Sequence, residues 1–446
     1  MHFYQSTGAN ELFVEKNLST MAPKQGVAQV SINIDTAKTY QTMDGFGASF
    51  TDSSAYLINQ VLDKDVKEDL MPKLFCHEKG IGISMIRNPM GASDYARKIY
   101  SYNTIPEGET DFQLTKFSIA HDLTDILPLT KQAIEINPNV KVAASPWSAP
   151  GWMKTVGSMK TGELRQDCYD AYAMYFVRFI QEYEKRGIPI YYITPQNEPL
   201  YMPDHYPSMF MPAHTQADFI ANHLKPAFVK HGITTKILCY DHNWDRPDYP
   251  LHVLDVAGPC VDGVAWHWYG GRPVAQHQVL MAYPNKEVHF SEGSGGEWIP
   301  EFEPAFSNLM RTTIEILRNH AQSLVLWNMA LDENNGPFVP GFGTSTCRGI
   351  VKVNQQTKEL TYTLDYYGLA HFSKYVRPGA VRVDSNCAHA VRTVAFKNTD
   401  GSVVTVLFND EEEARNVSLS HEGEVTDFCM PTKSALTMRI HSKNEQ

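Results

Sequence analysis

Residues 191–199 read Tyr-Tyr-Ile-Thr-Pro-Gln-Asn-Glu-Pro, and residues 288–293 read Val-His-Phe-Ser-Glu-Gly. Each run is apolar, β-branched or aromatic over the length of a strand and stops at a glutamate. In a barrel of parallel strands, the carboxyl ends of the strands surround the mouth of the pocket. Glu198 and Glu292 are therefore predicted to flank one scissile bond. A glycosidic bond is the usual target of such a carboxylate pair.

The middle of the chain alternates short apolar runs with long amphipathic stretches. Eight runs are predicted as strands: 42–50, 82–90, 140–148, 189–197, 236–243, 261–269, 287–293 and 323–331. Helical spacing lies between them, including 122–136, 165–187, 213–232 and 301–320, and a last helix is predicted at 364–376. Eight β/α alternations favour an α/β chain folded as a (β/α)8 TIM barrel over an open sheet.

The two ends of the chain carry a different pattern. Apolar and polar residues alternate from Val27 to Tyr40, and the same pattern returns only after residue 379. We therefore expect one side β-sandwich built from N- and C-terminal strands. Its parts are residues 1–41, an N-terminal segment with a strand, and residues 379–446; the catalytic barrel takes 42–378. Residues 1–25 are expected to be a frayed terminus, and the acidic run 410–413 a solvated hairpin loop.

Composition excludes several classes of protein. With 43% hydrophobic and 20% charged residues over 446 positions, the chain is an ordinary globular protein. The net charge of −11 argues against a nucleic-acid partner. Seven scattered cysteines without a C-x-x-C pair predict reduced thiols rather than a disulfide framework. The start of the chain lacks the features of a Sec signal, and no transmembrane run occurs. We expect a cytoplasmic protein as synthesised, or one exported by a leaderless or dedicated secretion system.

The residues at the predicted strand ends are polar or aromatic more often than a structural rim requires. They are Arg87 and Asp94, Ser145 and Trp147, Gln196 to Glu198, Asp241 and His242, Trp266 to Tyr269, Ser291 and Glu292, and Trp327 and Asn328. Carboxylates accept hydrogen bonds from sugar hydroxyls, and indoles stack on the apolar face of a pyranose. A separation of about 5–5.5 Å between the two carboxyls would retain the anomeric configuration, and about 6.5–9.5 Å would invert it.

Several motifs resemble glycoside hydrolase family 30, most closely its acid β-glucosidase (glucosylceramidase) branch. They are co-linear from about residue 42 to the final strands: Gly45-Phe-Gly-Ala-Ser-Phe-Thr-Asp52, Ile86-Arg-Asn-Pro-Met90 with Asp94, Ala144-Ser-Pro-Trp147, Gln196-Asn-Glu-Pro199, Val264-Ala-Trp-His-Trp-Tyr269, Phe290-Ser-Glu292, and Leu326-Trp-Asn-Met-Ala-Leu331 with Gly336-Pro337. The fold of that family, a barrel fused to a β-sandwich, matches the layout predicted above.

The resemblance implies roles for nine residues. Glu198 is similar to the family's general acid/base and Glu292 to its nucleophile. Of the remaining seven, Asp94 and Trp147 resemble residues that bind glucose hydroxyls, Asn197 one that holds the 2-hydroxyl, Tyr269 one that hydrogen-bonds the nucleophile, Trp327 the indole at the base of the glucose pocket, and Arg87 and His267 supports for the carboxylates. No cofactor is implied, because two carboxylates suffice for acetal hydrolysis.

Structural interpretations stand beside these roles. Glu198 could be a rim salt bridge, Asp94 a helix N-cap, and both tryptophans core residues. A metal site at His267 and His242 is not expected, because the sequence offers no suitably spaced third ligand. Asp52 is expected to cap the first barrel helix.

The resemblance predicts a retaining β-glycosidase that hydrolyses terminal β-glucosides, foremost glucosylceramide-like glycolipids. The loop 200–212, rich in methionine and aromatic residues, suits a lipid leaving group reached by transient membrane contact, and it could equally be packing. Within the same family, a β-xylosidase, β-fucosidase or β-1,6-glucanase is the alternative. Outside enzymes, the alternative is a non-catalytic carbohydrate- or lipid-binding barrel. The sequence does not indicate an oligomeric state.

Overall fold

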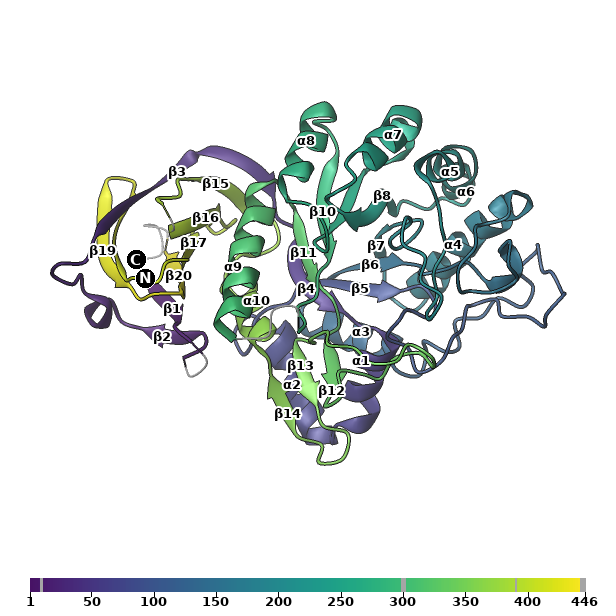
Figure 1. The fold of residues 1–446 in the computed structure, drawn as a ribbon, viewed down its shortest axis with the longest axis horizontal. Coiled ribbons are helices and arrows are strands. Elements are labelled where there is room, and N and C mark those ends of the chain that lie inside the picture. The colour runs from purple at the N-terminus through teal and green to yellow at the C-terminus, as the bar shows by residue number, and fades with distance from the viewer. Residues whose placement is uncertain (9–10, 298–301, 390, 442–446) are drawn as a thin grey trace.

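The computed structural model describes residues 1–8, 11–297, 302–389 and 391–441 (Figure 1). Figure 1 shows two bodies side by side: a barrel surrounded by helices, and a curled sheet that holds both chain ends. This arrangement confirms the predicted fold class of a TIM barrel with a side β-sandwich. Among the described residues, no helix combines the length and the apolar character needed to cross a membrane.

Eight parallel strands close the barrel. In chain order they are β4 (Gly45–Ser49), β5 (Met85–Pro89), β6 (Lys141–Ser145), β7 (Ile190–Ile193), β8 (Lys236–Asn243), β9 (Gly263–His267), β10 (Glu287–Glu292) and β11 (Ser323–Leu326). Each lies within a predicted range. Because both faces of such strands are buried, most of them read in the sequence as short apolar runs with polar residues near their ends.

The helices form the outer ring of the barrel. They are α1 (Asp52–Tyr56), α2 (Lys64–Phe75), α3 (Ile126–Ile136), α4 (Tyr169–Glu184), α5 (Ala213–Phe219), α6 (Lys225–Lys230), α7 (Asp248–Ala257), α8 (Val274–Ala282), α9 (Phe302–Arg318) and α10 (Leu364–Ser373). The predicted helix 213–232 is divided, because a π-helical turn at Ile220–Leu224 separates α5 from α6.

The last predicted strand, 323–331, is wrong in its extent. β11 ends at Leu326, and β12 (Ala330–Asp332) instead joins β13 (Val351–Val353) and β14 (Leu360–Tyr362) in a small separate sheet. Between β11 and β12 the backbone of Asn328 takes a left-handed conformation (φ 53°), which interrupts the strand. Asn328 is the one polar residue between Leu324 and Leu331, and asparagine adopts this conformation more readily than most residues, so the sequence carried a weak signal of this turn.

The second body is one nine-stranded sheet. Its strands are β1 (His2–Ser6), β2 (Val14–Lys16), β3 (Gln29–Thr42), β15 (Val381–Ser385), β16 (Val391–Lys397), β17 (Val403–Asn409), β18 (Arg415–His421), β19 (Glu424–Met430) and β20 (Ser434–Ile440). The curled sheet encloses its own apolar core, to which β3, β17, β18 and β20 contribute.

The prediction of a frayed terminus is wrong for the first strand. β1 pairs with β20 in an antiparallel ladder, and Phe3 is buried in the core of the sheet. At the end of β1, the Ser6 hydroxyl lies 2.8 Å from Nε2 of His371 on α10. A five-residue strand is too short to show a periodic pattern, and its pairing partner lies more than 400 residues away.

Two smaller expectations are also corrected. Thr51, rather than Asp52, caps α1, with its hydroxyl accepting from the backbone of Ser54. Asp52 instead forms a salt bridge with Arg97 at 2.8 Å. The acidic run 410–413 is not wholly solvated, because Asp410 accepts from Arg311 of α9 at 2.6 Å. This ion pair ties the sandwich to the barrel.

Candidate active site

The two glutamates predicted from the sequence meet at the mouth of the barrel. Glu292 is the last residue of β10, and Glu198 lies in the segment after β7. One carboxylate oxygen of each lies within 4.8 Å of the other. This separation fits the class of paired carboxyls about 5 Å apart, in which one acts as a nucleophile, and is too short for an attacking water between them.

Arg87 on β5 contacts several residues of the site. Its guanidinium donates from Nη1 to Glu292 at 2.7 Å, and from Nη2 to Asn197 Oδ1 at 2.7 Å. Because the Asn197 amide oxygen accepts this bond, its NH2 group is the donor that it can offer to a ligand. The Tyr269 hydroxyl donates to the other oxygen of Glu292 at 3.0 Å. Both donors favour an ionised Glu292.

Beneath the carboxylates lies Asp241, a fully buried residue of β8. It accepts from Arg87 Nη2 at 2.8 Å and His267 Nε2 at 3.0 Å. Three hydroxyls complete its shell: Ser145 at 2.7 Å, Thr194 at 2.6 Å and Ser291 at 2.5 Å. Burial alone would raise the pKa of Asp241, but Arg87 and His267 hold this pKa well below its ordinary value.

His267, at the end of β9, connects Asp241 to Glu198. Its ring nitrogens lie 3.0 Å from Asp241 and 3.1 Å from Glu198. Burial opposes protonation, yet Glu292, Asp241 and Glu198 together raise the pKa of His267 to about 9. At neutral pH both ring nitrogens therefore carry protons and donate to the two carboxylates.

The two glutamates form one coupled pair. Burial alone would raise the pKa of Glu198, but the hydrogen bond from His267 and the nearby His242 ring lower it. Burial raises the pKa of Glu292 more than His267 and Arg87 lower it, and the charges of Glu198 and Asp241 add to the rise. Two negative charges this close cannot easily coexist, so the pair is suited to hold one proton.

The same cluster could in principle hold a cation. Glu198, His267 and Glu292 each bring a ligand atom within 4.8 Å of the others. His267, however, uses both ring nitrogens as hydrogen-bond donors, and its raised pKa keeps it protonated. A protonated imidazole has no lone pair for a metal, so the residues fit acid–base chemistry better than coordination.

Two indoles and a carboxyl group lie close to Arg87 and Glu292. Trp147, just beyond β6, and Trp327, just beyond β11, stack with ring centroids 4.9 Å apart and are almost fully buried. Arg87 lies 4.9 Å above the Trp147 ring. Asp94 Oδ1 is buried and has no hydrogen-bond partner among the described residues. Burial and the charge of Glu292 raise the pKa of Asp94 to about 8. This carboxyl is therefore available to a polar ligand.

All nine residues predicted from the sequence thus lie in one cluster. The central position of Asp241 was not predicted, although its place at a strand end was noted. A signal was present, because an aspartate that directly follows the apolar residues 237–240 of a buried strand must find buried partners. Tyr206 belongs to the loop 200–212 that was noted from the sequence, but its packing against the cluster of Trp147 and Trp327 was not predicted. Its role depends on how that loop folds, which no local pattern indicates.

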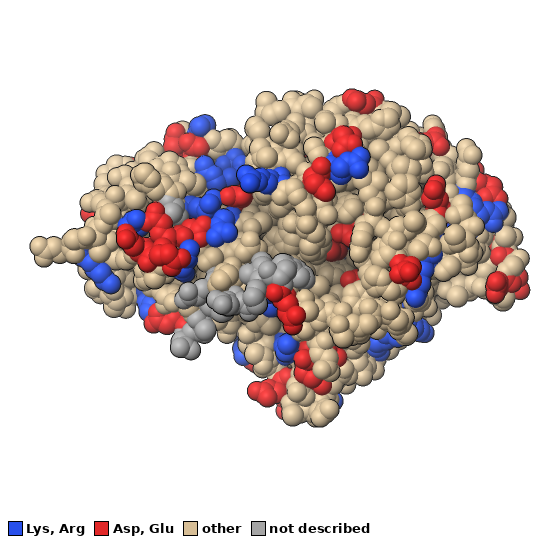
Figure 2. Space-filling model, viewed as in Figure 1, with Lys and Arg blue, Asp and Glu red and all other residues tan. Residues whose placement is uncertain are grey.

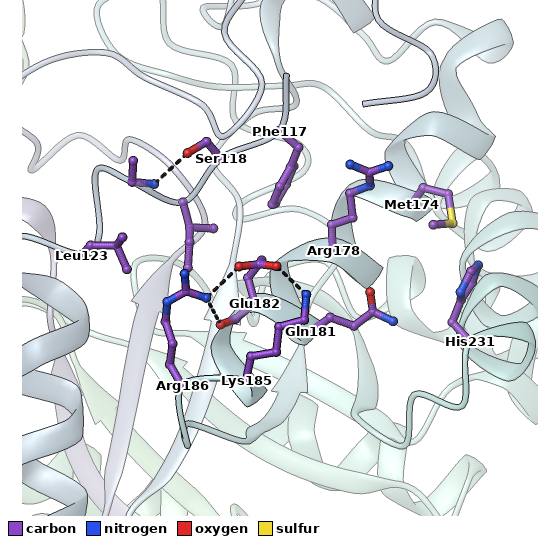
Figure 3. Close-up of a pocket in the computed structure, with 12 residues that line it drawn as sticks. Phe117, Ser118, Leu123, Met174, Arg178, Gln181, Glu182, Lys185, Arg186 and His231 are labelled. Carbon is purple, nitrogen blue, oxygen red and sulfur yellow. Dashed lines mark hydrogen bonds and ion pairs between the residues drawn. The ribbon is translucent and has the colours of Figure 1, made fainter. Parts of the chain in front are cut away.

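A separate hollow of about 490 Å³ lies on the outside of the barrel, against α4 (Figure 3). Glu182 accepts hydrogen bonds from both Lys185 and Arg186 at 2.7 Å, as the dashed lines in Figure 3 show. Arg178 donates to the backbone oxygen of Leu114 at 2.6 Å. The charges of this hollow are therefore already satisfied, in contrast to the barrel mouth.

Comparisons with known proteins agree with this geometry. Residues 43–376 match the model of the glycosyl hydrolase family 30 TIM-barrel domain, and residues 379–438 match the family 30 beta sandwich domain. An endo-1,6-beta-D-glucanase of Aspergillus fumigatus is 31% identical over 88% of this chain and 85% of its own length. The lysosomal acid glucosylceramidase of Mus musculus is 29% identical over 87% of this chain and 79% of its own.

A solved structure of an endo-beta1,6-glucanase superposes with a TM-score of 0.90 at 30% identity, covering 99% of both chains. The family models match most of the chain, the similarity to relatives extends over most of their length, and the paired carboxylates fit the same family. The chain belongs to glycoside hydrolase family 30.

Proposed function

We propose that this protein is a retaining β-1,6-glucanase, with Glu292 as nucleophile and Glu198 as general acid/base. The observation that carries the reaction type is the approach of the two carboxylates to within 4.8 Å at the ends of β7 and β10. The substrate is suggested by the relatives, since endo-1,6-β-glucanases match nearly the whole chain at 30–31% identity.

In the first step, a Glu292 oxygen attacks the anomeric carbon while Glu198 protonates the glycosidic oxygen. The glycosidic C–O bond breaks, and the rest of the glucan leaves as an alcohol. Arg87 and Tyr269 donate to Glu292 and aim its oxygens, and both contacts stabilise the carboxylate that attacks against the burial that raises the pKa of this residue. The Asn197 amide donates to the sugar 2-hydroxyl, a contact that strengthens in the transition state.

In the second step, Glu198 acts as a base. It takes a proton from a water molecule, which attacks the same carbon and displaces Glu292. Two inversions give net retention. His267 favours this step, because its donated hydrogen bond stabilises Glu198 once that residue has lost its proton.

Glycolipid hydrolysis of the glucosylceramidase type is the second candidate. Tyr201 and Met202, in the loop after Glu198, are 49% and 45% exposed. Large apolar side chains at this exposure could contact a lipid leaving group or a membrane surface. The similarity to a lysosomal acid glucosylceramidase supports this candidate too.

The test compares substrates and labels the nucleophile. We expect linear β-1,6-glucan and its oligosaccharides to be cleaved faster than glucosylceramide in mixed micelles, with β-1,3- and β-1,4-glucans as linkage controls. A glucose-configured cyclitol epoxide should add one adduct, mapped by mass spectrometry to Glu292 and absent in Glu292→Gln. Faster turnover of glucosylceramide would favour the second candidate. The absence of an adduct and of any turnover, in a folded sample, would contradict both.

A further inference from the structure

A groove of about 750 Å³ opens beside the candidate active site. Tyr269 and Ser294 line its inner end. The Tyr269 side chain is 42% exposed and its hydroxyl donates to Glu292, while Ser294 lies two residues after Glu292. The groove therefore begins beside Tyr269, the residue that donates to the nucleophile. The molecular face drawn in Figure 2 is hollowed near its centre, beside the region where Figure 1 draws α9 and β10.

One wall of the groove is a polar stripe on α9. Asn308, Thr312 and Glu315 are spaced by four and three residues, so they lie along one face of the helix. All three are partly exposed and carry hydrogen-bonding groups. Glu315 accepts from Arg392 of β16 at 2.6 Å, which places the outer end of the groove at the sandwich.

The opposite wall combines an indole with a free cation. Trp268 is partly exposed and is fixed by a hydrogen bond from its ring nitrogen to the Ser294 carbonyl at 3.2 Å. Arg272 is exposed, and no described residue forms a hydrogen bond or ion pair with its guanidinium. Gly271 before it has a φ of 82° and approaches the Asp245 backbone so closely that a Cβ would lie 2.4 Å from it. This turn therefore requires glycine and fixes the start of Arg272.

An indole face opposite rows of hydrogen-bonding groups matches the chemistry of a sugar chain. An acyl chain would instead leave the polar groups on α9 without partners, which is unfavourable. The groove also lies on the other half of the rim from the glucose pocket. The pocket residues follow β5, β6 and β11, and the groove follows β8, β9 and β10.

We propose that this groove binds the leaving-group glucose units of a β-1,6-glucan chain. The proposal rests on the proposed function and extends it from one sugar to the polymer. With one unit in the pocket above Trp147 and Trp327, the chain on the far side of the scissile bond follows the groove past Tyr269 towards α9. Arg272 and Asn308 would hydrogen-bond its hydroxyls, and Trp268 would stack on a ring.

The test uses Arg272→Ala and Asn308→Ala, with Arg246→Ala as a matched control. Arg246 is an exposed arginine near the barrel mouth that does not line the groove. An aryl β-glucoside extends beyond the glucose pocket by a single aryl ring, which lacks the hydroxyls that Arg272 and Asn308 would bind, so its kcat/KM should be unchanged in all three variants. On β-1,6-linked glucose oligosaccharides, kcat/KM should fall about five- to tenfold in the two groove variants, as expected for one or two lost hydrogen bonds.

A second measurement tests whether the groove binds the leaving-group side of the glucan chain. A retaining enzyme can transfer its glycosyl group to a sugar bound where the leaving group was. Transfer to an added β-1,6-linked disaccharide should therefore fall by the same factor. Unchanged oligosaccharide kinetics in both variants would contradict the proposal that the groove binds sugar, while leaving β-1,6-glucanase activity established. Slower oligosaccharide cleavage with normal transfer would overturn the leaving-group assignment. If the wild type does not cleave the oligosaccharides, the proposed function itself fails.

Discussion

Replacing Asp241 with asparagine tests whether the buried ion pair beneath the carboxylates supports the site. In the native protein, five groups donate to this carboxylate, and two of them, Arg87 and His267, carry positive charge. An asparagine of the same size would turn an NH2 group towards these donors. Arg87, fully buried, would keep only Glu292 as a counter-ion.

The expected loss of stability is about 3–5 kcal/mol, the range for breaking a buried ion pair by removing one partner. A matched control is Ser145→Ala, which removes one neutral donor to Asp241 and leaves the other four. It should reduce the free energy of unfolding by only about 1 kcal/mol. Both values are measured by urea denaturation at pH 7, followed by circular dichroism.

The contribution of Asp241 to stability should depend on pH in one direction. The folded pKa of Asp241 lies well below that of the unfolded residue. Its contribution to stability is therefore present above about pH 4 and is lost as the pH falls through the folded value. Asp241→Asn should lack this contribution and also lose activity on an aryl β-glucoside, because His267 and Arg87 would no longer be held in place. An Asp241→Asn protein as stable as Ser145→Ala, with wild-type kcat/KM, would refute the role given to Asp241.

Three further predictions concern single residues. Glu198→Gln should slow hydrolysis of glucosides with poor leaving groups by about 10²–10⁴-fold. With aryl glucosides that have good leaving groups, the variant should accumulate the glycosyl-enzyme on Glu292, detected by intact mass, and an equal loss of activity on both substrate types would contradict an acid/base role. Burial raises the pKa of Asp122 to about 6, despite hydrogen bonds from tyrosines, so the wild type should lose about 2 kcal/mol of stability as the pH rises from 4 to 7. Asp122→Asn should flatten this slope in urea denaturation, and an unchanged slope would refute the assignment. Burial lowers the pKa of Lys154 to about 7, and its ammonium donates to the Ser208 carbonyl at 2.5 Å. The stability of the wild type, measured by thermal unfolding, should therefore rise between about pH 7 and 10, and that of Lys154→Met should not.

The barrel could be predicted because its strands are buried on both faces. Runs such as Ile190–Ile193 and Ser323–Leu326 are largely apolar, short and separated by helical spacing, so pattern and topology agree. The strands that the sequence did not reveal, such as Val14–Lys16 and Val351–Val353, have three residues each. Such strands exist because a partner lies beside them, and their own pattern carries too little information.

The candidate site was predictable to the extent that it follows strand ends. Glu292 is the final residue of its strand, as expected. Glu198 is not, because β7 ends at Ile193 and the chain reaches Glu198 through an irregular segment. The Glu198 backbone is held in a left-handed conformation (φ 46°) by a hydrogen bond from its own N–H to the Asp241 carbonyl at 3.0 Å. That contact spans 43 positions in sequence, so no local pattern could indicate it.

Two bulges explain how adjacent residues of one strand can both serve the site. The ladder between β8 and β9 shifts between Tyr240 and His242, and the ladder between β9 and β10 shifts between Phe290 and Glu292. The residues at the shifts are Asp241 and Ser291, and the Ser291 hydroxyl donates to Asp241.

In a regular strand, successive side chains point to opposite faces, so Ser291 and Glu292 could not both reach the barrel interior. A bulge re-aims one side chain and bends the strand, at the cost of local strain. The positive φ of Asp241 (65°) records that strain. It persists because the buried hydrogen bonds of Asp241 hold it in place. The same network therefore supports the bulge and the nucleophile: a regular ladder at Ser291 would move its hydroxyl away from Asp241 and re-aim Glu292 relative to Glu198.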